Sequence, residues 1–185
     1  MKKLLLLLFI SFAFIGSANA NSIEGAFGYL LGETQSPEKK DCWYNFDCYS
    51  YSGFEPKKPL SHYPHYMFNL TFTTNKIYEI KGWTRREREQ LENCDGYDSE
   101  FGKILGMLEA KYGDFEKISW GYKSAAFKFE DGDRRIFINC FSDRERDSYE
   151  STLTYTDFKL EKLHKNEIEA YKKTKFLEEA KDYDL

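Results

Sequence analysis

The stretch that decides the fold is SEFGKILGMLEAKY, Ser99 to Tyr112, together with AAFKFEDGDRRIFINCF, Ala125 to Phe141. In the first part, apolar residues recur at the spacing that places them on one face of a helix: Phe101, Ile104, Leu105, Leu108 and Tyr112. In the second part, apolar and polar residues alternate on both sides of Asp131-Gly132, which is typical of two antiparallel strands joined by a turn. A helix followed by such a strand pair indicates an α+β domain.

Similar alternation predicts further strands along the chain. Met67–Phe72 alternates and leads through a turn into a second strand at Tyr78–Ile80, and Thr152–Phe158 alternates again. The apolar segment Phe27–Leu31 is expected to form the first strand. We therefore predict an antiparallel sheet of five to six strands, with the Ser99–Tyr112 helix packed on one face.

Two more helices are expected. Thr84 and Glu87 have the spacing of a capping box, which predicts that a short helix begins there. From Leu160 onward the chain is rich in Lys and Glu and carries a thin apolar stripe, which predicts a solvated, partly projecting C-terminal helix. The alternative is that this helix binds a partner.

The first twenty residues have the pattern of a cleavable signal peptide. Lys2-Lys3 precedes the apolar run Leu4–Ile15, and Ala18-Asn19-Ala20 fits the small-x-small cleavage rule. Cleavage after Ala20 would leave a mature chain that begins at Asn21. The apolar run is shorter than the roughly 20 residues of a membrane-spanning helix, so we expect no stable membrane insertion after cleavage. The alternative is that the segment stays uncleaved and anchors the protein in the membrane.

The rest of the chain has the length of a single domain. We divide it into a disulfide-stapled α+β domain at residues 21–160 and a charged C-terminal helix at residues 161–185. The net charge is −4, and it becomes −6 when Lys2 and Lys3 are removed. An acidic chain without a basic block is not expected to bind nucleic acid or an anionic membrane surface.

Four cysteines in an exported chain indicate disulfides, and three connectivities are compatible with the count. We prefer Cys42–Cys48, which closes a short loop, and Cys94–Cys140, which ties together elements that pack in any case. A C-x5-C pair without a second short spacing is not typical of a zinc site, so no metal and no cofactor are expected.

The segment between Cys42 and Phe68 combines many aromatic residues with three prolines, which predicts a long ordered loop pinned by the first disulfide. Exposed aromatic side chains dominate binding hot spots, and a pinned loop loses less entropy on binding. The predicted partner-binding set is Trp43, Tyr44, Tyr49 and Tyr51. The alternative is that these rings seal the core beneath the loop.

Several short motifs support a resemblance. Phe27-Gly-Tyr-Leu-Leu-Gly32, Thr73–Ile80, Cys94, the helix end Lys111-Tyr-Gly113, Ile138-Asn-Cys140 and Leu153–Asp157 occur in this order. Together they resemble a group of small, mostly uncharacterised exported proteins of Gram-negative bacteria, over about residues 25–160. The resemblance implies a periplasmic location and a Cys94–Cys140 disulfide, and it supplies no catalytic residue.

No catalytic motif stands out in the sequence: there is no G-x-S-x-G elbow, P-loop or G-x-G-x-x-G. His62 and His65 are interpreted as surface-loop residues, because Pro64 between them argues against a helix that presents paired zinc ligands. We therefore expect a non-catalytic periplasmic, or secreted, binding protein whose aromatic loop meets a protein or glycan of the cell envelope. An inhibitor or immunity role is one form of this.

Two alternatives to a binding protein remain. The first is an envelope hydrolase that uses Asp and Glu for acid–base chemistry. The second is a structural accessory that docks on an envelope complex through residues 165–185.

Overall fold

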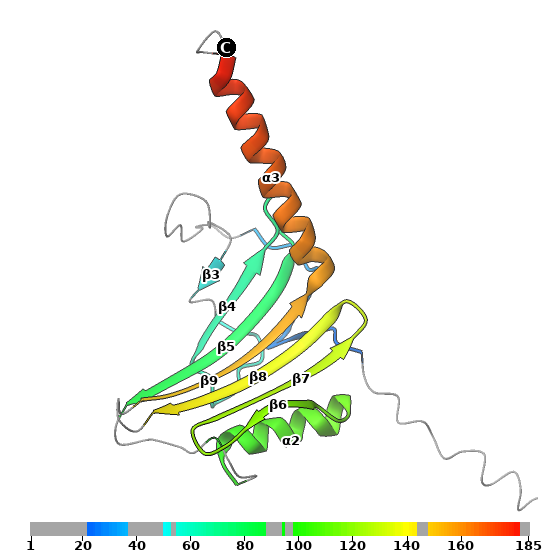
Figure 1. Cartoon of the computed structure of the whole chain (residues 1–185). Helices are drawn as coiled ribbons and strands as arrows, with labels where there is room; N and C mark the ends of the chain where they lie inside the picture. The colour runs from blue at the N-terminus through cyan, green and yellow to red at the C-terminus, as the bar shows by residue number, and fades with distance from the viewer. Residues whose placement is uncertain are drawn as a thin grey trace, which may run out of the picture.

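The computed structural model describes residues 22–36, 50–52, 55–87, 94, 98–143 and 148–181. Seven strands form one antiparallel sheet in the order β3-β4-β5-β9-β8-β7-β6 (Figure 1). These strands are β3 (Ser50–Ser52), β4 (His65–Leu70), β5 (Ile77–Glu87), β6 (Glu116–Trp120), β7 (Ser124–Asp131), β8 (Arg134–Asp143) and β9 (Ser148–Asp157). The other elements are a small hairpin of β1 (Gly25–Ala26) and β2 (Tyr29–Leu30), and the helices α2 (Glu100–Tyr112) and α3 (Phe158–Lys181).

The predicted α+β class is confirmed. Six strands of the large sheet have five or more residues, and the three-residue β3 adds a short seventh strand at one edge. Helix α2 packs on one face of the sheet, and α3 follows directly from β9 and projects beyond it (Figure 1).

Helix α2 begins and ends where the sequence predicts. The Ser99 hydroxyl accepts a hydrogen bond from the Gly102 N–H at 3.0 Å, which caps the first turn. Gly113 ends the helix with φ +102°, a conformation that side chains rarely adopt. The apolar face of α2 lies against β7, with the Phe101 ring 6.2 Å from the Phe127 ring.

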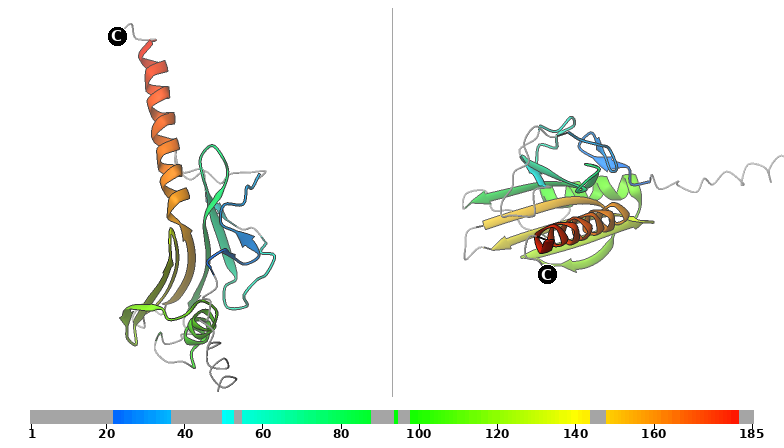
Figure 2. Two further views of the ribbon diagram at one scale, coloured as in Figure 1. Left: turned by 90° about the vertical axis from the view of Figure 1, so that its right-hand side faces the viewer. Right: turned by 90° about the horizontal axis from the view of Figure 1, so that it is seen from above.

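The N-terminal segment covers the same face of the sheet as α2 (Figure 2). The Phe27 ring packs edge-on against Tyr66, with ring centroids 4.8 Å apart, and stands directly over Gly82 of β5. The core on this inner face is rich in tyrosine as well as in aliphatic residues. Burial raises the pKa of both Tyr63 and Tyr155.

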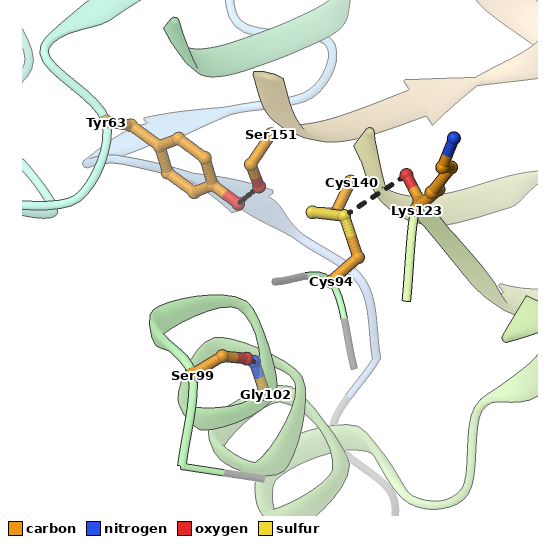
Figure 3. Close-up of a disulfide and its surroundings, with 7 residues drawn as sticks. All are labelled: Tyr63, Cys94, Ser99, Gly102, Lys123, Cys140 and Ser151. Atoms are coloured by element: carbon orange, nitrogen blue, oxygen red, sulfur yellow. Dashed lines mark hydrogen bonds between the residues drawn. A yellow bond between two sulfur atoms is a disulfide. The ribbon is translucent and has the colours of Figure 1, made fainter. Parts of the chain in front are cut away.

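The disulfide Cys94–Cys140 is present, with the two Cα atoms 5.6 Å apart and both residues buried (Figure 3). It fixes the segment that precedes α2 to β8, as predicted. The predicted Cys42–Cys48 bond lies outside the described residues.

Two local predictions need correction, and one strand was missed. Phe27–Leu31 does not form one strand, because Phe27 and Gly28 have φ values of 53° and 87° and make the tight turn between β1 and β2. No helix begins at Thr84, because β5 continues to Glu87 and pairs with β9 along this length. The strand β6 was not predicted, since its sequence EKISW is mostly polar and exposed.

Candidate functional site: the outer face of the sheet

The side of the sheet opposite α2 and the N-terminal segment is called the outer face here (Figure 2). Side chains alternate between the faces of a strand, so the buried positions of each strand identify its outward positions. In register across β4, β5, β9 and β8, the outward residues form two central rows. The first row consists of His65, Trp83, Thr152 and Asn139. The second row consists of Met67, Lys81, Thr154 and Phe137.

The edge of this face toward β4 carries an aromatic pair. The rings of His65 and Trp83, which are directly opposite in register, are 5.5 Å apart at an interplanar angle of 30°. The Lys81 Nζ lies 5.8 Å from the centre of the Trp83 ring. On β8, Phe141 is 50% exposed. Rings are therefore accessible to a partner on both sides of the central threonines.

A hydrogen-bonded polar group lies on the same face, one row beyond Met67 and Lys81 as seen from the aromatic pair. The Ser50 hydroxyl donates to the Asn69 side-chain oxygen at 2.7 Å, and the Asn69 amide donates to a Glu79 carboxylate oxygen at 2.9 Å. Burial raises the pKa of the Glu79 carboxyl. The positive charge of nearby Lys81 lowers this pKa in part, and the negative charge of Glu161 raises it further. These contacts fix the orientation of Asn69.

The first turns of α3 close one end of the outer face. The Arg135 guanidinium lies 4.8 Å above the Phe158 ring and 5.9 Å from the Phe137 ring. Further along α3, the ring of buried His164 is 5.0 Å from the Tyr78 ring. The face between this helix and Phe141 is not covered by any element of the described ranges.

The predicted aromatic set is only partly described. Trp43, Tyr44 and Tyr49 lie outside the described residues, while the backbone of Tyr51 belongs to β3 and is in register with Phe68 of β4. Strand β3 therefore joins the sheet at its β4 edge, opposite Met67, Phe68 and Asn69.

A polar pocket of about 590 Å³ lies where β9 passes into α3, beside the β7–β8 turn, and contains three aspartates. Its central residue, Arg134, donates to Asp157 at 3.1 Å and to the Ile23 carbonyl at 2.6 Å. Asp157 also caps α3 by accepting the Leu160 N–H at 3.0 Å. These groups tie the N-terminal segment to α3, so a structural role accounts for them.

The prediction of surface-loop histidines was wrong for both residues, in different ways. His62 is buried, 4% exposed, beside Tyr63, and His65 lies on β4 rather than in a loop. The Tyr63 hydroxyl is 3.3 Å from the Ser151 hydroxyl inside the core (Figure 3). Over the described ranges, no three His, Cys, Asp or Glu side chains are grouped so that they could hold a metal ion.

Neither described helix combines the length and apolar composition that are needed to cross a membrane. Comparisons with protein-family models, with curated proteins and with solved structures found no match to this chain.

Proposed function

We propose that this protein is an exported, non-catalytic binding protein that recognises a protein partner through the outer face of its sheet. The observation that carries the proposal is the composition of that face. Its accessible or partly accessible residues include Met67, Trp83, Arg135, Phe137 and Phe141. Trp, Phe, Met and Arg are enriched at the centres of protein interfaces, whereas Glu, Asp and Ser are depleted there.

The shape of the face favours a protein over a single sugar chain. The rings lie on β5 and β8, which are separated by β9, so they flank a central strip of Thr152 and Thr154. Neighbouring strands are about 4.8 Å apart, so a ligand that touches both sides must cover roughly 10 Å across the strands. An extended surface of this kind suits a partner protein. The predicted loop set, Trp43, Tyr44, Tyr49 and Tyr51, is a separate candidate for the interface and is tested on its own.

Export to the periplasm is part of the proposal. The signal-like leader supports it, and so does the buried Cys94–Cys140 disulfide, since such bonds persist in oxidising compartments. The hydrolase alternative has less support, because Glu79, whose carboxyl pKa is raised by burial, does not line the polar pocket that holds the three aspartates.

The test uses the mature chain from Asn21 as an immobilised bait for envelope extract. The outer-face variant is Trp83→Ala/Phe137→Ala. The matched control is Trp120→Ala, since Trp120 is also partly exposed but contacts Phe127 of the inner face. The proposal expects a captured protein that the outer-face variant loses and the control retains. Equal capture by all three baits would refute it, as would binding to purified glycans in place of any protein.

The loop is tested separately by Trp43→Ala/Tyr51→Ala. Loss of the same partner in this variant would add the loop to the interface. Retention of the partner would restrict the site to the sheet.

A further inference from the structure

The polar pocket at the start of α3 holds more charged groups than the structural contacts of Arg134 and Asp157 use. Its volume of about 590 Å³ lies within the usual range for a small-molecule site, about 300–1,000 Å³. Arg134 and Asp157 pair with each other at 3.1 Å and hold the N-terminal segment and α3 in place. The pocket is also lined by two further cations and two further carboxylates: Lys76, Lys159, Asp131 and Asp133.

Most of these four groups have no partner. Within the described ranges, the side chains of Lys76, Lys159 and Asp133 make no hydrogen bond and no ion pair. Asp131 uses one carboxylate oxygen, Oδ2, which accepts the Ile23 N–H at 3.4 Å. Lys76 is partly buried, so its ammonium has lost part of its hydration without gaining an anion in return. An anionic ligand group would supply that missing partner.

The four side chains project from three different elements. Asp131 and Asp133 come from the end of β7 and the turn that joins it to β8, which lies beside the start of α3 (Figure 1). Lys76 precedes β5, and its main chain is fixed by two hydrogen bonds of 2.8 Å with Thr71. Lys159 belongs to the first turn of α3. The cations and the carboxylates therefore enter the pocket from separate parts of the backbone.

The balance of charge indicates the class of ligand. Once Arg134 has paired with Asp157, two positive and two negative groups remain in the pocket. A simple anion would be repelled by the two carboxylates, and a simple cation would be repelled by the two lysines. A molecule with a carboxylate at one end and an ammonium at the other complements both sets.

An apolar surface lies next to the charged groups. Leu160 and Leu163, one turn apart on α3, complete the lining of the pocket. Leu163 is 37% exposed, so its side chain is accessible from the pocket. A ligand that carries an aliphatic side chain between its charged ends would cover this surface.

We infer that this pocket binds a zwitterionic ligand with an aliphatic side chain, either a free α-amino acid or a short peptide. Lys76 and Lys159 hold its carboxylate, and Asp131 and Asp133 hold its ammonium group. The two leucines contact its side chain. None of the five outer-face residues named for the proposed function lines the pocket, so the inference does not depend on that function.

The first test is isothermal titration calorimetry of the full mature chain with two probes, L-leucine and the dipeptide leucyl-leucine. At least one of them is expected to bind with a Kd below about 1 mM. Binding of leucine alone identifies free amino acids as the ligand class, and binding of the dipeptide alone identifies peptides. For the probe that binds, the N-acetylated form and the C-amidated form should each bind at least about tenfold more weakly. The inference is overturned if neither probe binds, or if the blocked forms bind as well as the free one.

The second test assigns the two ends of the ligand. Lys76→Met should weaken binding of the free probe about tenfold but change binding of the amidated form little, because that form has no carboxylate to lose. Asp133→Asn should do the same for the free probe and the acetylated form. The matched controls, Lys162→Met and Asp114→Asn, remove exposed charges outside the pocket and should bind as wild type does.

Circular dichroism checks that each variant is folded. In folded variants, equal losses for the free and blocked forms would overturn the assignment of the two ends and with it the inference. The outer-face variant Trp83→Ala/Phe137→Ala should bind the probe as wild type does, which separates this site from the proposed protein interface.

Discussion

Replacing Gly82 by alanine is expected to destabilise the protein, although a glycine-to-alanine replacement within a strand usually increases stability. A Cβ atom at Gly82 would lie 2.8 Å from Cζ and 3.2 Å from Cε2 of Phe27, and 3.3 Å from Cε1 of Tyr66. Overpacking of this kind costs about 1–3 kcal/mol, whereas a strain-free Gly→Ala change gains about 0.4–1 kcal/mol through the unfolded chain. We expect a net loss of about 1–2 kcal/mol in the free energy of unfolding.

The Phe27 ring has little room to move aside. It is held between Tyr66 and the rings of Tyr63 and Tyr155, whose centroids lie 6.5 Å and 6.3 Å away. Its own backbone has φ 53° in the turn between β1 and β2, which restricts a shift of the main chain. The cost at Gly82 should therefore come mainly from the Phe27 ring, which makes the two closest contacts.

The assay is urea unfolding of the mature protein followed by circular dichroism. The control is Gly106→Ala in α2, because a Cβ there meets nothing within 4 Å and alanine should gain about 0.5–1 kcal/mol in a helix. In a Phe27→Leu background, Gly82→Ala should cost at least about 0.5 kcal/mol less, since the colliding ring atoms are gone. A Gly82→Ala protein as stable as wild type, or a cost unchanged by Phe27→Leu, would refute this reasoning.

Other predictions concern the disulfide, a titrating group and the two faces. Replacing both Cys94 and Cys140 by serine should lower the free energy of unfolding by about 4 kcal/mol, which is the value of the loop-entropy model for their sequence separation of 46. Urea unfolding measures this loss, and a loss below about 1 kcal/mol would contradict the model. Because the folded state raises the pKa of Glu79 above 4.5, its ionisation opposes folding as pH rises through that value. Glu79→Gln should therefore be more stable than wild type at pH 7, and this advantage should vanish below about pH 4.5 in a pH series of unfolding curves; no advantage at pH 7 would count against the raised pKa. Phe141→Ala on the outer face should change stability by less than about 0.5 kcal/mol, whereas Phe127→Ala in the core should cost about 3–5 kcal/mol. Similar costs for the two would show that the outer face is packed.

The parts of the fold that the sequence predicts are those set by local contacts. Helix α2 has its apolar stripe, its Ser99 cap and its Gly113 terminator within one short segment, and all three are present in the structure. The β7–β8 hairpin likewise has both strands and its turn at Gly132 close together in sequence. Local chemistry failed at Thr84, where the capping-box pattern competes with pairing between β5 and the distant β9. The long-range pairing prevails because it buries Thr84.

The candidate site was harder to predict because it depends on register between distant strands. The sequence shows the capping-box pattern of Thr84 and Glu87 directly after Trp83, and this pattern favoured a short helix over a strand. Only pairing of β5 with β9 and of β9 with β8 brings Trp83, Thr152 and Asn139 into one row. Alternation along β8 places Phe137 on the opposite face of the sheet from Ile136 and Ile138, which are both buried.

The two faces of the sheet differ in how they contribute to the protein. The inner face supplies the apolar burial that stabilises the fold, through α2, the N-terminal segment and the tyrosine-rich core. On the outer face, Thr152 and Thr156 of β9 are buried, whereas Phe141 is half exposed and Trp83 and Phe137 are partly exposed. The outer aromatic rings therefore leave apolar surface in water. Under the proposed function a partner protein would cover these rings, so the outer face is the part of the molecule to test first.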